Sequence, residues 1–548
     1  MKKYFVKSLI VIMSIMLVLI GCSNKTDNSK VSDDVSEEIT LTEPGTFPIV
    51  EEPVEMTILV RGDARVEDFA TNAFTKWYEE KTNVKIYWEV APEGSIEETL
   101  NLRLASGDFP DVIMNMGVTR AQEMIYGEQG VFLALNDLID SQGYYMKDMF
   151  EANPEYKETI TAPDGNIYSV PEVNECYHCS LAVKMWMYQP WLDKLGIDTP
   201  QTTDEFYQAL KAFKEQDPNG NGQPDEIPLA GAENSWNSQV WLFLMNSFVN
   251  TPPDRLYLDN GKVTASFMQP GWKEGLQYLN KLYSEGLLAA ESFTQDEQQF
   301  RQLGENPGTP ILGAAPAGHQ GIFSQIGGDS GRWLEYQTIP PLEGPSGLRQ
   351  SVSFPYQVGT GKFVITSAAK YPEVAFRWAD GLFNEEHTRR MNTGVPGEDW
   401  EEAEEGVLGI DGSPAKVNVL TAYGNVQNNQ WFQAGPSWMS NEYRFSEAAT
   451  NPEENLEVIL YNQSNENYEP YRADIETVIP PLFFTEEQST ELADLQKTIS
   501  DYVDEMLARF ITGDANIDAE WDSYLQVLND MNIERYLQIY QEAYDSGE

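Results

Sequence analysis

Positively charged residues are scarce in this 548-residue chain. It has 36 lysines and arginines against 87 aspartates and glutamates, which gives a formal net charge of −51 at pH 7. Nucleic-acid binding depends on Lys and Arg side chains that neutralise phosphates, so this balance argues strongly against a nucleic-acid partner. It argues more weakly against a polyanionic ligand, because such a ligand needs only a local gathering of arginines.

Long apolar runs are also lacking, apart from one at the N-terminus. Residues 8–20 are almost wholly apolar, follow three lysines and end at Gly21-Cys22. The run is too short to span a bilayer, and its flanks are typical of a signal peptide, residues 1–21. A small residue before a cysteine at this point resembles a bacterial lipobox. The resemblance implies cleavage before Cys22, diacylglyceryl modification of its sulfur, and a lipid anchor at the extracellular face of the cell membrane. The alternative is an ordinary signal peptide that happens to contain a cysteine.

The segment after Cys22 has few aromatic residues. Ser, Asn, Thr, Asp and Glu dominate residues 23–52, and prolines punctuate its end. Such a composition cannot bury enough apolar surface to offset the conformational entropy of folding. We therefore predict a disordered, lipid-anchored tether over residues 22–52, with the folded body starting near Met56. The roughly 490 residues that remain are too many for one hydrophobic core, which predicts at least two lobes.

Cysteine and histidine are rare, with three of each in the whole chain. Cys176 and Cys179 form the single CxxC pair, and a four-ligand zinc site has no further partners nearby in the sequence. The pair is therefore expected to be either a tight local disulfide or two reduced, packed thiols. Export favours the disulfide.

Motifs for catalysis are lacking as well. The chain contains no G-x-S-x-G and no H-E-x-x-H sequence. Gly359 to Lys362 resembles part of a P-loop, but Tyr356 stands where the first glycine belongs and Phe363 replaces Ser or Thr. Pairs of carboxylates occur by chance among 87 acidic residues and carry no information. We predict that the protein is not an enzyme.

Short apolar, β-branched segments alternate with segments of helical spacing. Residues 56–62, 84–90 and 111–115 are predicted strands, separated by helices. This alternation predicts βαβ units and a parallel sheet, hence an α/β fold. Residues 486–548 are predicted to be mostly helical because large apolar residues recur there at intervals of three and four.

Four segments, in this order along the chain, resemble family 1 extracellular solute-binding proteins. They are LASGDFPDV at 104–112, APDGNIYSVP at 162–171, WLDKLG with PQTTDEF over 191–206, and the stretch from Gly513 through RYLQIY at 535–540. The last segment is similar to the LipO-like lipoprotein branch of Gram-positive bacteria. The resemblance covers nearly the whole chain after the tether.

The resemblance implies a two-lobed periplasmic-binding-protein-like fold with a hinge, a ligand cleft between the lobes and a helical C-terminus. Both lobes are expected to be discontinuous. We place 53–172 and 312–365 in the N-terminal lobe, and 173–311 and 366–548 in the C-terminal lobe. The implied function is capture of an oligosaccharide for the membrane subunits of an ABC-type importer, by a monomer that touches the membrane only through its lipid.

Residues 217–226 have the spacing of a calcium loop. Asp217, Asn219 and Asn221 occupy positions 1, 3 and 5, and a glycine at position 6 allows a sharp turn. Position 12 is Pro228 in place of the usual Glu. The loop is similar to one in alginate-binding members of the family, which implies structural calcium held by Asp217, Asn219, Asn221, the Gln223 carbonyl, Asp225 and Glu226. A polar Asn-Gly turn without metal is the alternative.

Two segments mix tryptophans with amide side chains, residues 233–241 and 425–438. Sugar rings stack on aromatic faces while their hydroxyls bond to polar side chains, and loops often carry such sites. For any single tryptophan, burial in the core is the alternative. The predicted ligand-binding residues are Trp236, Trp241, Asn428, Trp431 and Trp438, together with Arg61, Asn115, His319 and Tyr356.

Two other functions remain open from the sequence. One is an exported glycoside-processing enzyme, and the other is a receptor lipoprotein for a peptide or signal. Chromogenic glycosides separate the first of these from a binding protein, because a binder gives no turnover. The loops favour a neutral or mixed oligosaccharide over an ion, which would not need broad stacking faces.

Overall fold

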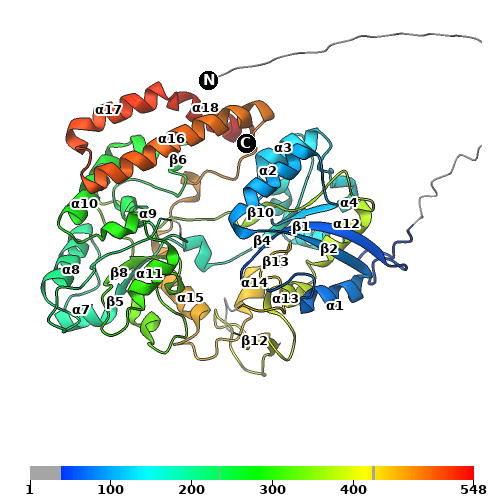
Figure 1. The fold of residues 1–548 in the computed structure, drawn as a ribbon, viewed down its shortest axis with the longest axis horizontal. Helices are drawn as coiled ribbons and strands as arrows, with labels where there is room; N and C mark the ends of the chain where they lie inside the picture. Colours follow the sequence, from blue (N-terminus) through cyan, green and yellow to red (C-terminus); the bar gives the residue numbers. More distant parts are fainter. Residues whose placement is uncertain (1–38, 234, 422–425, 548) are drawn as a thin grey trace, which may run out of the picture. The chain divides into compact units, whose positions relative to one another are not determined.

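The first lobe is built on a six-stranded sheet whose strand order is β13-β4-β10-β3-β1-β2 (Figure 1). The computed structural model describes residues 39–233, 235–421 and 426–547. Strands β1 and β2 pair in parallel, β1 and β3 likewise, and β10 runs antiparallel between β3 and β4. The three predicted strands are therefore confirmed as β1, β2 and β3. The bounds of the six strands are Val54–Arg61 (β1), Val84–Ala91 (β2), Val112–Met114 (β3), Val170–Asn174 (β4), Val358–Ile365 (β10) and Trp438–Met439 (β13).

Helices surround this sheet in Figure 1. Strands β11 (Trp400–Glu402) and β12 (Val417–Val419) form an antiparallel pair between helix α13 and strand β13 of this lobe. The helices are α1 (Ala73–Thr82), η1 (Glu93–Ser95), α2 (Ile96–Ser106), α3 (Arg120–Glu128), α4 (Asn136–Gln142), α5 (Tyr145–Ala152), α6 (Pro154–Ile160), α12 (Pro372–Gly381), α13 (Glu385–Thr393) and α14 (Asn441–Phe445).

The second lobe is largely helical around a three-stranded antiparallel sheet of order β8-β5-β9. Its strands are β5 (Met185–Tyr188), β8 (Ala314–Pro316) and β9 (Tyr336–Ile339), with a hairpin of β6 (Leu256–Asp259) and β7 (Lys262–Ala265). Its helices are α7 (Gln189–Leu195), α8 (Thr203–Glu215), α9 (Val240–Leu244), α10 (Pro270–Ser284), α11 (Glu297–Gly304), α15 (Leu456–Asn467), α16 (Glu486–Thr512), α17 (Ile517–Asp530) and α18 (Ile533–Gly547). Short 3-10 turns are η2 (His178–Leu181), η3 (Met245–Ser247), η4 (Ser266–Met268), η5 (Ala290–Phe293), η6 (Gln320–Ile322), η7 (Arg332–Glu335), η8 (Glu469–Tyr471) and η9 (Ile475–Thr477).

The helical C-terminus is confirmed, and α16 shows why it forms. Thr485 and Gln488 make a reciprocal capping box at its start, and Gly513 ends it in the left-handed conformation at φ 84°. Val503, Met506 and Phe510 recur at helical spacing and are buried in the core of this lobe. Helix α16 packs against α10 and α18. Within the described ranges, no helix is both long and apolar enough to cross a membrane.

The folded body begins earlier than the sequence indicates. Leu41 pairs with Val50 in an antiparallel bridge, and Ile49 and Val50 are fully buried. Arg377 of α12 donates to the carbonyls of Thr42 and Glu43. The predicted tether is therefore wrong for residues 41–52, because this short apolar turn finds partners in the first lobe that composition alone does not reveal. The signal peptide, Cys22 and the tether up to residue 38 lie outside the described residues.

Strand pairing moves two of the expected lobe crossings. After β4 the chain enters the second lobe, close to the expected crossing near residue 172. Strands β8 and β9, expected in the first lobe, instead pair with β5. Helices α12 and α13 and strand β13, expected in the second lobe, pack with the six-stranded sheet. The crossings thus fall at residues 351–358 and after α14, set by long-range pairing that has no local sequence signal.

Candidate functional site

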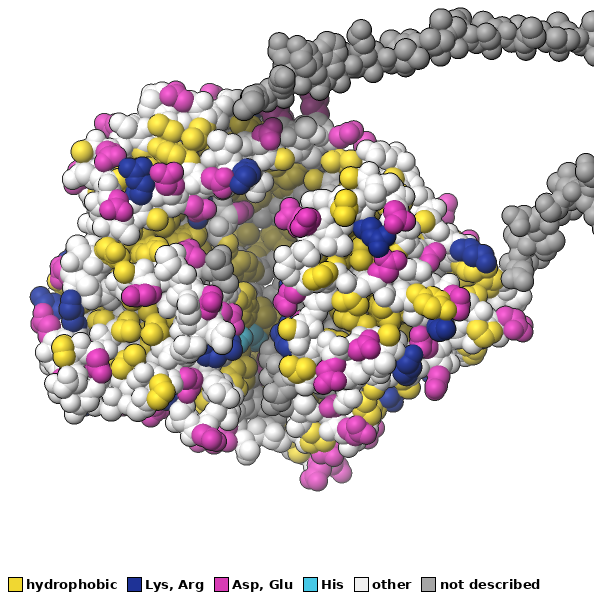
Figure 2. Space-filling view, in the orientation of Figure 1, with side chains coloured by type: hydrophobic (Ala, Val, Ile, Leu, Met, Phe, Trp, Pro, Cys, Tyr) yellow, Lys and Arg dark blue, Asp and Glu magenta, His cyan; other side chains and the backbone are white. Residues whose placement is uncertain are grey.

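A pocket of about 570 Å³ opens where the chain passes between the lobes. Figure 2 shows the surface hollowed between the two lobes, with acidic side chains spread over the surrounding face. Five separate parts of the chain contribute to this pocket: α6, the end of β4 with the turn after it, the crossing at 353–358, the start of α14 at 441, and residues 472–475. The lining residues are Glu155, Tyr156, Thr159, Val173, Glu175, Tyr177, Ser180, Ser353, Pro355, Tyr356, Gln357, Val358, Asn441, Arg472, Ala473 and Ile475. We call it the hinge pocket.

Three tyrosines line the hinge pocket, and two of them present aromatic surface to it. Tyr356 is 40% exposed and Tyr177 is partly buried, whereas Tyr156 is buried, with 7% of its surface exposed. The Tyr156 hydroxyl donates to Oε1 of Glu175, and Oε2 of Glu175 accepts from the backbone N–H of Asn441 at 2.7 Å. Burial, and then this hydrogen bond, raise the pKa of Tyr156, so the phenol stays protonated. The carboxylate of Glu175 thereby ties α6 to the start of α14.

Arg472 supplies the fixed positive charge of the hinge pocket. Its Nη1 donates to Oγ of Ser353 and its Nη2 to Oγ of Ser180, both at 3.1 Å. Its Nε lies 3.1 Å from both carboxylate oxygens of Glu469, and this hydrogen bond is the first cause that lowers the pKa of Glu469. The guanidinium therefore joins the crossing segment to the turn after β4, and its planar donors suit hydroxyl or carboxylate acceptors.

Asn441 has an unsatisfied hydrogen-bond acceptor. Its side-chain Oδ1 is buried and has no hydrogen-bond partner among the described residues. A buried acceptor without a partner costs about 1–3 kcal/mol, which a hydroxyl of a bound molecule would recover. The hinge pocket thus combines the anchored carboxylate of Glu175 and the guanidinium of Arg472 with a buried amide oxygen of Asn441 that has no partner among the described residues.

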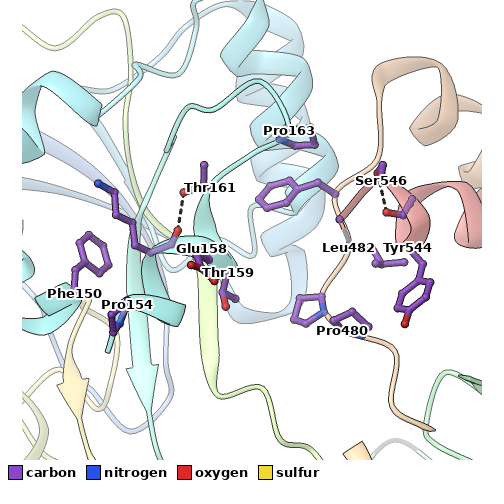
Figure 3. A pocket seen from close by; sticks show the side chains of 15 residues that line it. Phe150, Pro154, Glu158, Thr159, Thr161, Pro163, Pro480, Leu482, Tyr544 and Ser546 are labelled. Atoms are coloured by element: carbon purple, nitrogen blue, oxygen red, sulfur yellow. Dashed lines mark hydrogen bonds between the residues drawn. The ribbon is translucent and has the colours of Figure 1, made fainter. Parts of the chain in front are cut away.

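A second pocket, of about 760 Å³, adjoins the first and shares Thr159 with it. Figure 3 shows Phe150, Pro154 and Glu158 on one side of it, and Pro480, Leu482 and Tyr544 on the other. Its lining is rich in proline and aromatic side chains, so it extends the hinge pocket with a more apolar compartment. The residues of α5 and α6 belong to the first lobe, whereas 480–483 and α18 come from the helical C-terminus.

The structure brings one predicted binding residue, Tyr356, into the hinge pocket. Trp236 and His319 lie together elsewhere in the second lobe, with ring centroids 5.5 Å apart, and Trp236 is 38% exposed. Nδ1 of His319 accepts from the N–H of Gly321, and burial lowers the pKa of His319 to about 4. The imidazole is therefore neutral at pH 7, and part of the indole beside it is open to solvent.

Arg61 and Asn115 lie at the carboxyl ends of β1 and β3. Arg61 is half exposed and its guanidinium is 3.9 Å from the carboxylate of Glu93. Oδ1 of Asn115 accepts from Nζ of Lys362 at 3.0 Å, and Lys362 also pairs with Glu172 at 2.8 Å. In α/β folds, ligands bind at such strand ends. Both residues thus have suitable positions, outside the lining of the hinge pocket.

Trp431 and Trp241 belong to the core, which corrects their prediction as stacking platforms. Trp431 is 0% exposed, its Nε1 donates to Thr75, and it packs on Trp88 and Trp378. Trp241 is 6% exposed and lies in α9 within the core of the second lobe. Neither indole leaves a face for a sugar ring, because both side chains are buried.

Asn428 and Trp438 also have structural partners. Oδ1 of Asn428 accepts from the N–H of Asp68, and its Nδ2 donates to Thr71 at 3.1 Å. These bonds hold the turn that leads into α1. Trp438 lies on β13, which pairs with β4 at Val173. Its Nε1 has no hydrogen-bond partner among the described residues.

Cys176 and Cys179 form a disulfide in the structure. Gln357 of the crossing segment donates from Nε2 to the carbonyl of Cys176 at 3.2 Å. Tyr177 lies within the four-residue ring that the disulfide closes, so the bridge fixes the backbone that carries one wall of the hinge pocket. Of the two expectations for this pair, the structure has the disulfide.

The loop at 217–226 gathers the oxygens predicted to hold calcium. Asp217 accepts from the N–H groups of Gly220 and Gly222, and the side chains of Asn219 and Asn221 both donate to Asp225. Oε1 of Glu226 is buried and has no hydrogen-bond partner in the described part of the chain. Burial first, and then the charges of Asp217 and Asp225, raise the pKa of Glu226. Three carboxyl groups surround one turn, and one of them has an unpartnered oxygen. This arrangement suits a hard divalent cation that prefers oxygen ligands.

Sequence reasoning missed Tyr156, Glu175, Tyr177, Asn441 and Arg472. Tyr177 had a usable signal, since it stands inside the CxxC pair beside the expected hinge. The other four come from segments up to about 300 residues apart, and none has a local motif. Tryptophan-rich segments of the sequence suggest sugar-binding platforms, whereas the aromatic residues that line this pocket are tyrosines.

Two lobes with a polar, aromatic pocket at their crossings define a ligand-capturing binding protein. Residues 63–388 match the family described as bacterial extracellular solute-binding proteins, and the chain belongs to this family. It is 28% identical, over 99% of its length and 98% of the relative's, to the fructooligosaccharide ABC transporter substrate-binding protein FusA of Streptococcus pneumoniae. It is 24% identical to lipoprotein LipO of Bacillus subtilis over 58% of this chain and 61% of LipO.

The fold is also similar to a solved structure of Streptococcus pneumoniae FusA, an EF-hand mutant in complex with fructo-nystose. The two share a TM-score of 0.77 and 27% identity, covering 90% of this chain and 99% of that one. The two-lobed fold and the family implied by the four sequence segments are thus confirmed.

Proposed function

We propose that this protein captures an uncharged oligosaccharide in the hinge pocket and delivers it to the membrane subunits of an ABC-type importer. The observation that carries the proposal is the pocket itself, in which the faces of Tyr177 and Tyr356 lie among anchored polar groups. Full-length similarity to FusA, a fructooligosaccharide-binding protein, supports the same class of ligand. The strongly negative surface weighs against an acidic glycan.

In this proposal Tyr177 and Tyr356 stack on sugar rings, and the buried Tyr156 holds the carboxylate of Glu175 in place. Glu175 and Asn441 accept hydrogen bonds from hydroxyls, and Arg472 donates to ring or hydroxyl oxygens. Because the pocket takes walls from both lobes, a ligand binds the closed arrangement better than the open one and shifts the population toward it. Trp236, His319, Arg61 and Asn115 are further contacts for the distal units of a longer chain. The adjoining pocket has room for additional sugar units.

The same proposal includes a structural calcium ion in the loop at 217–226. Asp217, Asn219, Asn221, the Gln223 carbonyl, Asp225 and Glu226 would hold it, and the ion would neutralise three neighbouring carboxyl groups. The EF-hand in the FusA relative supports this reading. The metal would rigidify a loop of the second lobe and take no part in ligand chemistry.

Anchoring through Cys22 completes the proposal. Cys22→Ala should release the protein into the medium or leave it as an uncleaved precursor. A Cys22→Ala protein that is still processed, lipid-labelled and bound to membranes would contradict the anchor. The lipoprotein relative LipO supports it. We also propose that the protein binds without turnover, as chromogenic glycosides would test.

Calorimetry against a panel of glycans tests the function. The panel contains fructooligosaccharides, uncharged gluco-oligosaccharides and galacturonate oligomers. A ligand should give a 1:1 isotherm and raise the melting temperature by mass action. Binding of an uncharged oligosaccharide that is lost in Arg472→Ala, and kept in the control Arg509→Ala at an exposed arginine of α16, would support binding in the hinge pocket. Binding of galacturonate alone, or of a peptide, would overturn the proposed ligand class.

A further inference from the structure

The turn after β4 contains three side chains that could bind a metal ion, and two of them are the cysteines joined by the disulfide. One ligand atom from each of Cys176, His178 and Cys179 lies within 4.8 Å of the other two, among the described residues. Nε2 of His178 is 3.4 Å from Sγ of Cys176 and 3.9 Å from Sγ of Cys179. A fourth group comes from α15, since Oε2 of Glu457 lies 3.4 Å from the same Nε2.

These distances match the edges of a tetrahedral zinc site. With Zn–S near 2.3 Å and Zn–N and Zn–O near 2.0–2.2 Å, tetrahedral geometry places N and S ~3.5 Å apart and N and O ~3.4 Å apart. The three edges that meet at His178 are already within a few tenths of an ångström of these lengths. The edge between the two sulfurs is the exception, because a covalent bond joins them. Opening that bond and turning the imidazole are the two changes that the geometry needs, because Nδ1 of His178 also lies 3.9 Å from Sγ of Cys179 and Nε2 must face the metal.

We propose that this cluster is a thiol-gated zinc site, in which the reduced protein binds Zn²⁺ through Cys176, His178, Cys179 and Glu457 and the disulfide form does not. Two thiolates, an imidazole and a carboxylate are a ligand set that suits zinc. The chain supplies the fourth ligand from a helix some 280 residues away, which is why the sequence shows only three.

Burial and hydrogen bonds from neighbouring residues hold the Cys176–Cys179 turn in this conformation. Cys176 and His178 are 3% and 8% exposed. Lys184 is fully buried and donates to the carbonyls of His178 and Leu181, which fixes the turn. Arg444 donates to Oε2 of Glu457 at 3.2 Å and to Asn174. In the disulfide form this arginine compensates the charge of Glu457, and in the zinc form it orients the carboxylate as an outer partner.

The chemistry balances with an external reductant. A phosphine takes the oxygen of water as it gives two electrons to the disulfide, and two protons convert the sulfurs to thiols. Zinc then displaces the two thiol protons, so binding weakens as the pH falls. Tyr177 lies within the same turn, so the exchange of a disulfide for zinc would move a wall of the hinge pocket.

Cobalt titration tests the proposal without reference to any glycan. The full chain carries Cys22→Ser, so that Cys176 and Cys179 are its only sulfhydryl groups, and is reduced with a phosphine. We expect one Co²⁺ per chain, with thiolate-to-metal absorption and the visible bands of a tetrahedral ion, displaced by one equivalent of Zn²⁺. The unreduced protein should show neither signal.

Three variants separate a built site from loose thiols. Glu457→Gln and His178→Gln should each weaken cobalt binding at least tenfold, while a matched control, His387→Gln at a buried histidine of the first lobe, should not. Cys176→Ser with Cys179→Ser should abolish binding. Far-ultraviolet dichroism checks that each variant is folded. Equal binding by oxidised and reduced protein, or full affinity in both Glu457→Gln and His178→Gln, would overturn the proposal.

Discussion

Two aromatic groups in this protein look alike in the sequence and differ in what they do. Trp431, Trp378, Trp88 and Phe74 pack face and edge against one another inside the first lobe. Tyr177 and Tyr356 line the hinge pocket, and each has part of its side chain exposed. The first group stabilises the fold by burial, whereas the second keeps its surface available for a ligand. The comparison teaches that exposure and anchoring identify a platform better than residue type.

The largest expected effect tests the buried group. Trp431→Ala should reduce the free energy of unfolding by about 3–5 kcal/mol, because it removes a fully buried indole and leaves a cavity. Trp236→Ala, at an indole that is 38% exposed, is the matched control and should cost less than about 1 kcal/mol. Denaturant unfolding measures both. Equal losses in the two variants would break the distinction between core and surface tryptophans.

The pocket tyrosines should behave in the opposite way. Tyr177→Ala should weaken binding of the best glycan by tenfold or more, since a lost aromatic contact costs about 1–3 kcal/mol. Its unfolding free energy should change far less than that of Trp431→Ala. Tyr87→Ala, an exposed tyrosine on β2 outside the pocket, serves as control. Calorimetry measures the affinity. If it is unchanged in Tyr177→Ala, Tyr156→Ala and Tyr356→Ala, the glycan binds outside the hinge pocket.

The same contrast explains which parts of the fold and of the pocket could be predicted from the sequence. Periodicity located β1, β2 and β3 because local patterns decide those strands, and four ordered motifs implied the two-lobed family. The lobe crossings were misplaced, since pairing of β8 and β9 with β5 is a long-range event. Among the residues that line the hinge pocket, Tyr356 was predicted while Arg472 was not. An isolated arginine acquires its role only when folding brings Ser180 and Ser353 to it.

Tyr177 and Trp431 also show why composition misleads. Trp431 stands among asparagines and glutamines, as an exposed platform would, yet its neighbours in space are aromatic. Tyr177 stands beside cysteines and a histidine, which suggest metal or redox chemistry rather than sugar binding. In both cases the decisive partners lie more than 250 residues away, at Thr75 and Phe445. No local window contains that information.

Calcium removal should give an intermediate effect confined to the second lobe. A site filled at 100 times its Kd contributes about 2.7 kcal/mol to the folded state. Chelation should therefore lower the melting temperature, and Asp217→Ala should abolish that sensitivity. Asp411→Ala, at an exposed acidic turn of the first lobe, should leave it intact. A melting curve indifferent to chelator in the unmodified protein would contradict the site.

The smallest expected effect concerns a titrating group in the first-lobe core. Asp380 is 1% exposed and accepts from the N–H groups of Tyr144, Tyr145 and Met146 at the start of α5. Burial outweighs these hydrogen bonds and raises its pKa to about 6 from an ordinary 3.8. A raised carboxyl pKa stabilises the folded state fully below about pH 4, and this contribution is lost as the pH rises through 6.

Asp380→Asn should therefore change stability in a pH-dependent way while leaving ligand binding alone. Its melting temperature relative to that of the unmodified protein should rise between pH 4 and pH 7, because the variant has no carboxyl to ionise in the core. The slope cannot exceed about 1.4 kcal/mol per pH unit for one proton. Glycan affinity at pH 7 should be the same in both proteins, since Asp380 lies outside the hinge pocket. A melting difference that stays constant with pH would show that Asp380 does not titrate in this range. A loss of glycan affinity would instead show that the first-lobe core is coupled to the hinge pocket. The buried and the pocket-lining aromatic groups would then not have separate roles.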